Sequence, residues 1–81
     1  MYETYHIKKR IRQRGITNEM IDITLRYGEQ QGDKIRLGSR HIKRLLPNHQ
    51  DIKPQLLKIL DKGGLVVVVS GVVLITAYIW N

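Results

Sequence analysis

The last part of the sequence contains two apolar runs, Leu65–Val69 (LVVVV) and Val72–Trp80 (VVLITAYIW), which are separated by Ser70-Gly71. β-branched residues favour strands, and Ser-Gly has the length and composition of a two-residue hairpin loop. We therefore predict a C-terminal β-hairpin. Apolar residues on both faces predict that its strands are central in a sheet. A membrane anchor is the weaker reading, because a spanning helix needs about 20 residues.

Side chains alternate between the two faces of a strand. One face of the final strand is purely apolar, and we expect it to pack under helices: Val73, Ile75, Ala77 and Ile79. The other face becomes polar and aromatic towards its end, and we expect it to be an exposed working surface: Val72, Leu74, Thr76, Tyr78 and Trp80.

Two helices are predicted at the N-terminal end. Thr4 can cap a first helix that runs to about Arg14, and Gly15 then stops it. Thr17 can cap a second helix that ends at Gly28. The short link between the helices predicts a tight αα-hairpin. The second helix has a helical apolar face formed by Met20, Ile21, Thr24, Leu25 and Tyr27.

The middle of the chain gives weaker signals. Glu29–Gly38 predicts one weak strand, interrupted by Gly32-Asp33, with Ile35 and Leu37 pointing inward. Arg40–Leu46 suits either a short helix or a strand.

Pro47-Asn48 predicts a turn, and Pro54 predicts the start of a helix over Pro54–Lys62 that Gly63-Gly64 terminates. We expect its core face to consist of Leu56, Leu57 and Leu60. Residues 1–81 thus predict a single α+β domain. Two N-terminal helices pack on a small antiparallel sheet that ends in a C-terminal β-hairpin, with an extra short helix in the middle.

The composition narrows the possible functions. The 81 residues include no cysteine, which excludes disulfides and zinc-thiolate sites. Fourteen Lys and Arg against seven Asp and Glu give a net charge of +7, which predicts a polyanionic partner, nucleic acid first. The N-terminus lacks the apolar region of a signal peptide, so we expect none. We expect action in the cytoplasm and no stable membrane association.

The segment YHIKKRIRQRG (residues 5–15) concentrates positive charge. On a helix, Ile7 and Ile11 would form the buried stripe, and the three outward charges would be Lys8, Lys9 and Arg12. His6, Arg10 and Arg14 would line up along the edge of the core. Ordinary surface roles are the alternative, with Arg10 and Arg14 paired to acids such as Asp22, Glu19 or Glu29.

A His-Arg-Arg row suits metal-independent cleavage of RNA. Histidine can move a proton near neutral pH, and arginine can neutralise the charge that develops on phosphorus. A metal site is not expected, because the histidines are far apart in the sequence and no carboxylate cluster accompanies them. No cofactor motif is present.

A second basic cluster contains Arg40, Lys43 and Arg44, with His41 among them. It could extend an RNA-binding track, or it could be a solvated helix face. Tyr78 or Trp80 could stack a base.

The pattern Thr4-x-His6-x3-Arg10-x3-Arg14-Gly15-Ile16-Thr17, a second helix ending in Gly28, and the final hairpin with Ile75-Thr76-Ala77-Tyr78 resemble a known family. It is the group called domain of unknown function 4258, which is similar in turn to the RelE/ParE-like toxin superfamily. The resemblance covers about residues 4–28 and 64–79.

The resemblance implies a toxin of a toxin–antitoxin pair, or the toxic C-terminal part of a larger secreted toxin. It implies a metal-independent ribonuclease that cleaves mRNA or tRNA, and an acidic antitoxin or immunity protein as partner. The catalytic candidates are His6, Arg10, Arg14, Thr76 and Tyr78, and the RNA-binding candidates are Lys8, Lys9, Arg12, Arg40, Lys43 and Arg44. The alternative is a toxin that inhibits a large target such as gyrase without cleavage, because the same fold group contains such proteins.

Overall fold

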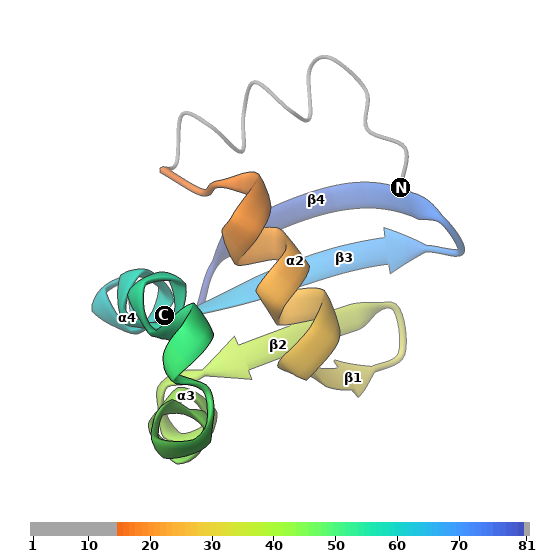
Figure 1. The fold of residues 1–81 in the computed structure, drawn as a ribbon. Coiled ribbons are helices and arrows are strands. Elements are labelled where there is room, and N and C mark those ends of the chain that lie inside the picture. Colours follow the sequence, from red (N-terminus) through yellow and green to blue (C-terminus); the bar gives the residue numbers. More distant parts are fainter. Residues whose placement is uncertain (1–14, 81) are drawn as a thin grey trace.

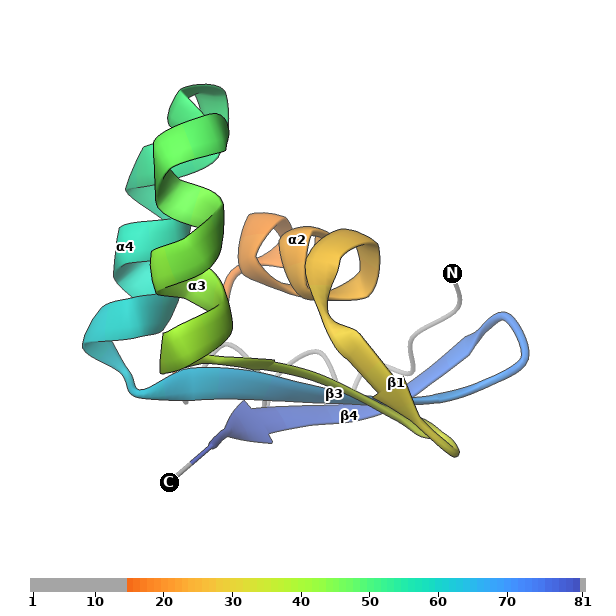
Figure 2. The same ribbon diagram turned by 90° about the horizontal axis from the view of Figure 1, so that it is seen from below.

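A computed structural model of the protein describes residues 15–80, which form an α+β fold (Figure 1). Its four-stranded antiparallel sheet has the order β1-β2-β3-β4, and the strands are β1 (Glu29–Gln31), β2 (Lys34–Gly38), β3 (Gly64–Ser70) and β4 (Val73–Ile79). The same residues contain three α-helices, α2 (Asn18–Tyr27), α3 (Ser39–Leu45) and α4 (Lys53–Asp61). These helices lie on one face of the sheet, with α3 and α4 near one end of it (Figure 2).

Helix α2 begins and ends where the sequence predicts. The Thr17 hydroxyl accepts a hydrogen bond from the backbone N–H of Met20 at 3.2 Å, which satisfies one of the free donors of the first turn. Gly28 follows the last residue of the helix, and its N–H donates to the carbonyl of Thr24. Met20, Ile21, Ile23 and Thr24 are buried. The predicted first helix, up to Arg14, lies outside the described residues.

The weak strand predicted over Glu29–Gly38 is a hairpin. Gln31 pairs with Lys34, so that Gly32-Asp33 is a two-residue turn between β1 and β2 and not an interruption within one strand. Gly32 has a φ of 62°, which a residue without a side chain adopts at little cost. Leu37 is fully buried and Ile35 half-buried, which confirms the inward positions predicted for them.

Two α-helices, and not one, separate β2 from β3. The ambiguous segment Arg40–Leu46 is helical, because α3 buries Ile42 on its inner side. Two short 3-10 helices, Leu46–Asn48 and Gln50–Ile52, then lead to α4. The element order of the described residues therefore differs from the predicted arrangement of two N-terminal helices, a sheet and one extra helix.

Helix α4 uses a slightly different face from the predicted one. Leu56 and Ile59 are fully buried, whereas Leu57 is 42% exposed. Residues 56, 59 and 60 share one side because side chains three and four positions apart are neighbours on a helix. Leu57 lies about 100° away from Leu56 around the axis.

The β3–β4 hairpin contains an irregularity that corrects the predicted faces of β4. Val68 pairs with Thr76 and Val69 with Leu74, so Ile75 is an extra residue in a β-bulge. Beyond the bulge Ala77 is buried, as predicted. Before it the alternation is inverted, so Leu74 is buried while Val73 and Ile75 are exposed. The loop residues are Gly71-Val72, one position later than predicted.

The core lies between the helices and the inner face of the sheet. Helices and strands both contribute to it, and its fully buried members include Leu37, Ile42, Leu56, Ile59, Leu65 and Val67. The opposite face of the sheet is therefore not used for the packing of α2, α3 and α4. This outer face carries Lys34 and Arg36 of β2, Val66 and Val68 of β3, and Thr76 and Tyr78 of β4.

Candidate functional site

The outer face of the sheet is organised in rows of paired residues. Arg36 pairs with Val66, which pairs with Tyr78. Because directly paired residues project to the same face, Arg36 and Tyr78 lie on one face with Val66 between them. The next row places Lys34, Val68 and Thr76 side by side in the same way. Basic residues of β2 and polar residues of β4 thus share one surface.

Trp80 lies across two glycines at the end of these rows. Gly38 pairs with Gly64, and the Trp80 N–H donates a hydrogen bond to the Gly64 carbonyl at 3.1 Å. A β-carbon added at Gly38 would overlap Cζ3 of the indole, so only glycine leaves room for the ring there. The guanidinium carbon of Arg36 lies 4.8 Å from the ring centre, within the range of a cation–π contact.

Helix α3 presents basic side chains beside this tryptophan. Arg40, His41 and Arg44 fall on one arc of the helix, because positions i, i+1 and i+4 lie within about 100° of each other. Ile42 lies on the opposite side and is fully buried, which fixes the orientation of the arc. Arg40 and Arg44 are exposed, and His41 is half-buried.

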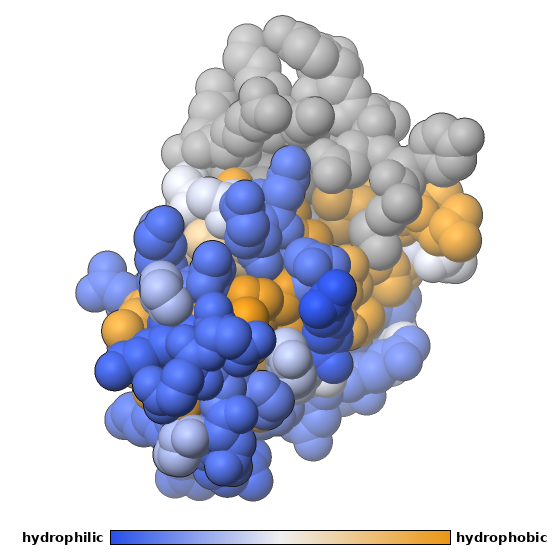
Figure 3. All heavy atoms as spheres, in the orientation of Figure 1, coloured by the Kyte–Doolittle hydropathy of each residue, from blue (hydrophilic) through white to orange (hydrophobic). Residues whose placement is uncertain are grey.

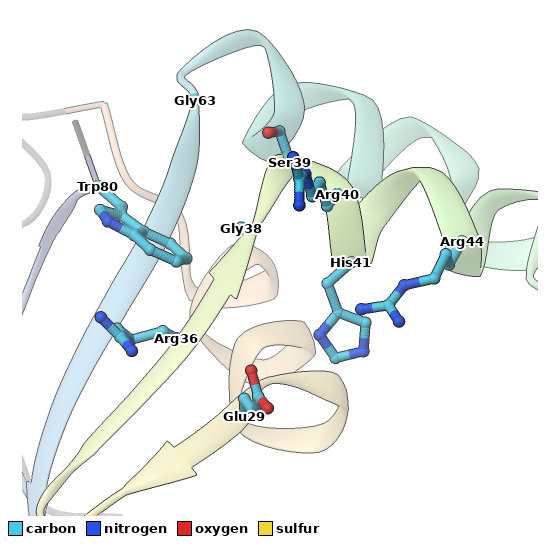
Figure 4. Close-up of a pocket in the computed structure, with 9 residues that line it drawn as sticks. All are labelled: Glu29, Arg36, Gly38, Ser39, Arg40, His41, Arg44, Gly63 and Trp80. Carbon is cyan, nitrogen blue, oxygen red and sulfur yellow. The ribbon is translucent and has the colours of Figure 1, made fainter.

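A cavity of about 460 Å³ joins these two groups of side chains (Figure 4). Arg36 and Trp80 border it from the sheet, and side chains of α3 border it from the other side. Its lining residues are Glu29, Arg36, Gly38, Ser39, Arg40, His41, Arg44, Gly63 and Trp80. Three arginines and a histidine therefore face one space together with a single carboxylate.

The cavity arginines are not neutralised by acids within residues 15–80. In this part of the chain the single ion pair joins Arg26 to Asp22 at 3.6 Å, on the exposed side of α2. Arg36 donates a hydrogen bond to the side-chain carbonyl of Gln31. The surface over α3 and α4 is hydrophilic, whereas hydrophobic side chains gather near the tip of the β3–β4 hairpin (Figure 3). The positive charge of the cavity is thus available to an anion.

The predicted site residues are distributed unevenly. Thr76 and Tyr78 are half-buried on the outer face, in the rows that also contain Lys34 and Arg36. Arg40 and Arg44 line the cavity, but Lys43 does not and is exposed on another side of α3. The remaining predicted residues, His6, Lys8, Lys9, Arg10, Arg12 and Arg14, lie outside the described residues. Their predicted proximity to Thr76 and Tyr78 stays a prediction.

Of the charged residues that line the cavity, Arg36 and Glu29 are not among the predicted site residues. The sequence does indicate the position of Arg36. Side chains alternate along a strand, so an arginine between the inward Ile35 and Leu37 must lie on the outer face. Glu29 is opposite Arg36 in the β1–β2 ladder. Its place beside Arg36 can be predicted only if Gly32-Asp33 is recognised as a hairpin turn.

The described residues contain no cluster of three or more His, Asp or Glu side chains that could hold a metal ion. Within residues 15–80, no helix is long and apolar enough to cross a membrane.

Neither family models, nor curated proteins, nor solved structures match this chain. The resemblance to domain of unknown function 4258 and to RelE/ParE-like toxins therefore stays a prediction from short motifs.

Proposed function

We propose that the protein is a toxin that cleaves RNA without a metal ion. The observation that carries the proposal is the basic cavity beside Trp80, whose arginines form no ion pair within residues 15–80 and which opens on the same sheet face as Thr76 and Tyr78. Arginine clusters bind phosphates, and aromatic rings stack on unpaired bases. An RNA strand along this face would contact both.

In the proposed reaction the substrate supplies its own nucleophile. A base accepts the proton of the ribose 2′-OH, and O2′ attacks phosphorus as the bond from phosphorus to O5′ breaks. An acid then protonates O5′, which leaves a 2′,3′-cyclic phosphate and a 5′-hydroxyl end. His6 is proposed as base or acid, and Arg10 and Arg14 as the groups that stabilise the charged phosphorane.

Thr76 and Tyr78 are proposed to position the scissile phosphate. Their positions on the outer face support this role. Tyr78 is in the same cross-strand row as Arg36, with Val66 of β3 between them. Neighbouring strands are about 4.8 Å apart, so the spacing across the row is about 10 Å. Arg36 and Tyr78 could therefore contact different nucleotides of one bound strand. We propose mRNA or tRNA as substrate and an acidic antitoxin or immunity protein as inhibitor.

A cleavage assay tests the proposal. The purified protein is incubated with total RNA in excess EDTA, and the ends of the products are analysed. Cleavage with 2′,3′-cyclic phosphate ends is expected, and His6→Ala and Arg10→Ala are expected to abolish it. Lys58→Ala removes an exposed charge on α4 and is the matched control. RNA that remains intact at high protein concentration would contradict the proposal.

The alternative proposal is a toxin that blocks a large protein such as gyrase without cleaving RNA. Exposed apolar side chains at the hairpin tip favour a protein partner, since Val72 is 70% exposed and Ile75 42%. This alternative predicts toxicity in cells that survives His6→Ala. It also predicts that toxicity is lost when the charges of Lys8, Lys9 and Arg12 are reversed.

A further inference from the structure

The geometry points to the cavity beside α3 as a binding site for one nucleotide, separate from the proposed cleavage residues. The α3 arginines would hold its phosphate, and its base would stack on the guanidinium of Arg36, which lies over the Trp80 ring. This inference takes its ligand class from the proposed function. The residues that carry the inference all lie within residues 15–80, and Thr76 and Tyr78 are not among those that line the cavity.

The arrangement of charge is the first argument for an anionic ligand. Arg40 and Arg44 are four residues apart on one side of a helix, and like charges at this spacing destabilise a helix slightly. None of the three cavity arginines is paired with a carboxylate of residues 15–80. A phosphate among them would relieve the repulsion and accept charge-assisted hydrogen bonds, which are stronger than neutral ones.

Trp80 is the second argument, because it distinguishes a nucleotide from phosphate alone. The backbone hydrogen bond to Gly64 and the absence of a side chain at Gly38 hold the indole at the edge of the cavity. Trp80 is 36% exposed, and Arg36 lies against its ring. Both an indole and a guanidinium plane stack on nucleobases, so a base is the complementary group here.

The size of the cavity and its single carboxylate are the third argument, because they indicate a ligand larger than phosphate. About 460 Å³ falls within the range of small-molecule sites and exceeds what an inorganic phosphate fills. Glu29 is an acceptor that cannot contact phosphate favourably, but it can accept hydrogen bonds from ribose hydroxyls or base amino groups. The phosphate is therefore assigned to the α3 side, and the nucleoside to the side of Trp80 and Glu29.

The fluorescence of Trp80 gives a direct measurement, because it is the only tryptophan of the chain. Full-length protein is titrated with adenosine 5′-monophosphate, adenosine, inorganic phosphate and a short polyglutamate peptide, and calorimetry repeats each titration. Adenosine monophosphate is expected to bind at least about tenfold more tightly than either adenosine or phosphate alone, because it makes both contacts. A 5′-phosphorylated trinucleotide shows whether a strand binds better than a free nucleotide.

Two substitutions on α3 and one on α4 separate a specific site from general charge. Arg44→Ala removes a cavity residue and is expected to weaken nucleotide binding about tenfold or more, which corresponds to the loss of a charge-assisted contact. Lys58→Ala removes the same charge from α4 and is expected to change the affinity less than about twofold. Lys43→Ala, on α3 but outside the cavity, is expected to lie near the control.

Equal losses for Arg44→Ala and Lys43→Ala would overturn the inference, since charge alone would then explain binding. Tighter binding of polyglutamate than of the nucleotide would overturn it too, in favour of an acidic protein segment. His6→Ala should retain nucleotide binding. If the nucleotide binds but RNA is not cleaved, only the proposed function fails. If RNA is cleaved but the nucleotide does not bind, only this inference fails.

Discussion

The guanidinium carbon of Arg36 lies 4.8 Å from the centre of the Trp80 ring, although Arg36 is in β2, Trp80 directly follows β4, and these two strands are not neighbours in the sheet. The intervening strand permits the contact because it carries Gly64 at that level, and Gly38 lies beneath the indole. Two glycines thus bring an arginine and a tryptophan together on the outer face. The cavity depends on this arrangement.

A double-mutant cycle on Arg36→Ala and Trp80→Ala measures the strength of the contact. We expect a coupling free energy of about 0.5–1 kcal/mol, because the pair is partly exposed. Urea unfolding followed by circular dichroism gives the four stabilities. Arg26→Ala combined with Trp80→Ala is the control, and the two effects should add within about 0.5 kcal/mol. Additivity for the Arg36 pair as well would contradict the contact.

Gly38→Ala is expected to destabilise the fold by about 1–3 kcal/mol, because the new methyl group would force the indole out of place. The backbone itself does not require glycine, since φ at Gly38 is −91°. The same substitution in a Trp80→Leu background should therefore be almost neutral. Urea unfolding of the four proteins checks this, and an equal cost in both backgrounds would show that the cause is not the ring.

Thr17→Ala is expected to cost about 1 kcal/mol of unfolding free energy, because the N–H of Met20 loses its acceptor at the start of α2. Thr17→Ser keeps the hydroxyl and should retain most of the stability. Thermal unfolding of both variants decides the question. A Ser variant as unstable as the Ala variant would mean that the methyl group of Thr17, and not its capping bond, is important.

The salt dependence of RNA binding tests the cavity as part of the RNA interface. With an uncleavable 2′-O-methyl oligonucleotide, Arg44→Ala should lower the slope of log K against log salt by about 0.7, the value for one phosphate contact on a single strand. Lys58→Ala should leave the slope unchanged. Fluorescence anisotropy at several salt concentrations measures both. An unchanged slope for Arg44→Ala would place the RNA elsewhere on the molecule.

Local signals in the sequence predict much of this fold. The cap at Thr17 and the glycine at Gly28 define α2 to within a residue, because both act on the chain next to them. The glycines at 63 and 64 end α4 in the same way, with φ values of 93° and 129°. The apolar runs near the C-terminus form strands as expected.

The predictions that are wrong concern residues whose orientation depends on pairing with another strand. Leu74 and Ile75 are equally apolar, so nothing local identifies Ile75 as the bulged residue that inverts the alternation of β4. The cavity shows the same limit. The local cluster of basic residues predicts Arg40 and Arg44 as RNA-binding residues, but Arg36 and Glu29 reach the same cavity only because β1 pairs with β2.

The path from β2 to β3 leaves the sheet after Gly38 and returns to it at Gly64, and these two glycines are paired neighbours. The helical segment between them is therefore an excursion from the sheet whose two ends meet at one residue pair. Arg40, His41 and Arg44 belong to this excursion, whereas Arg36 and Trp80 belong to the sheet. One side of the cavity is thus positioned by the packing of α3 on the core, and the other side by the pairing of the strands.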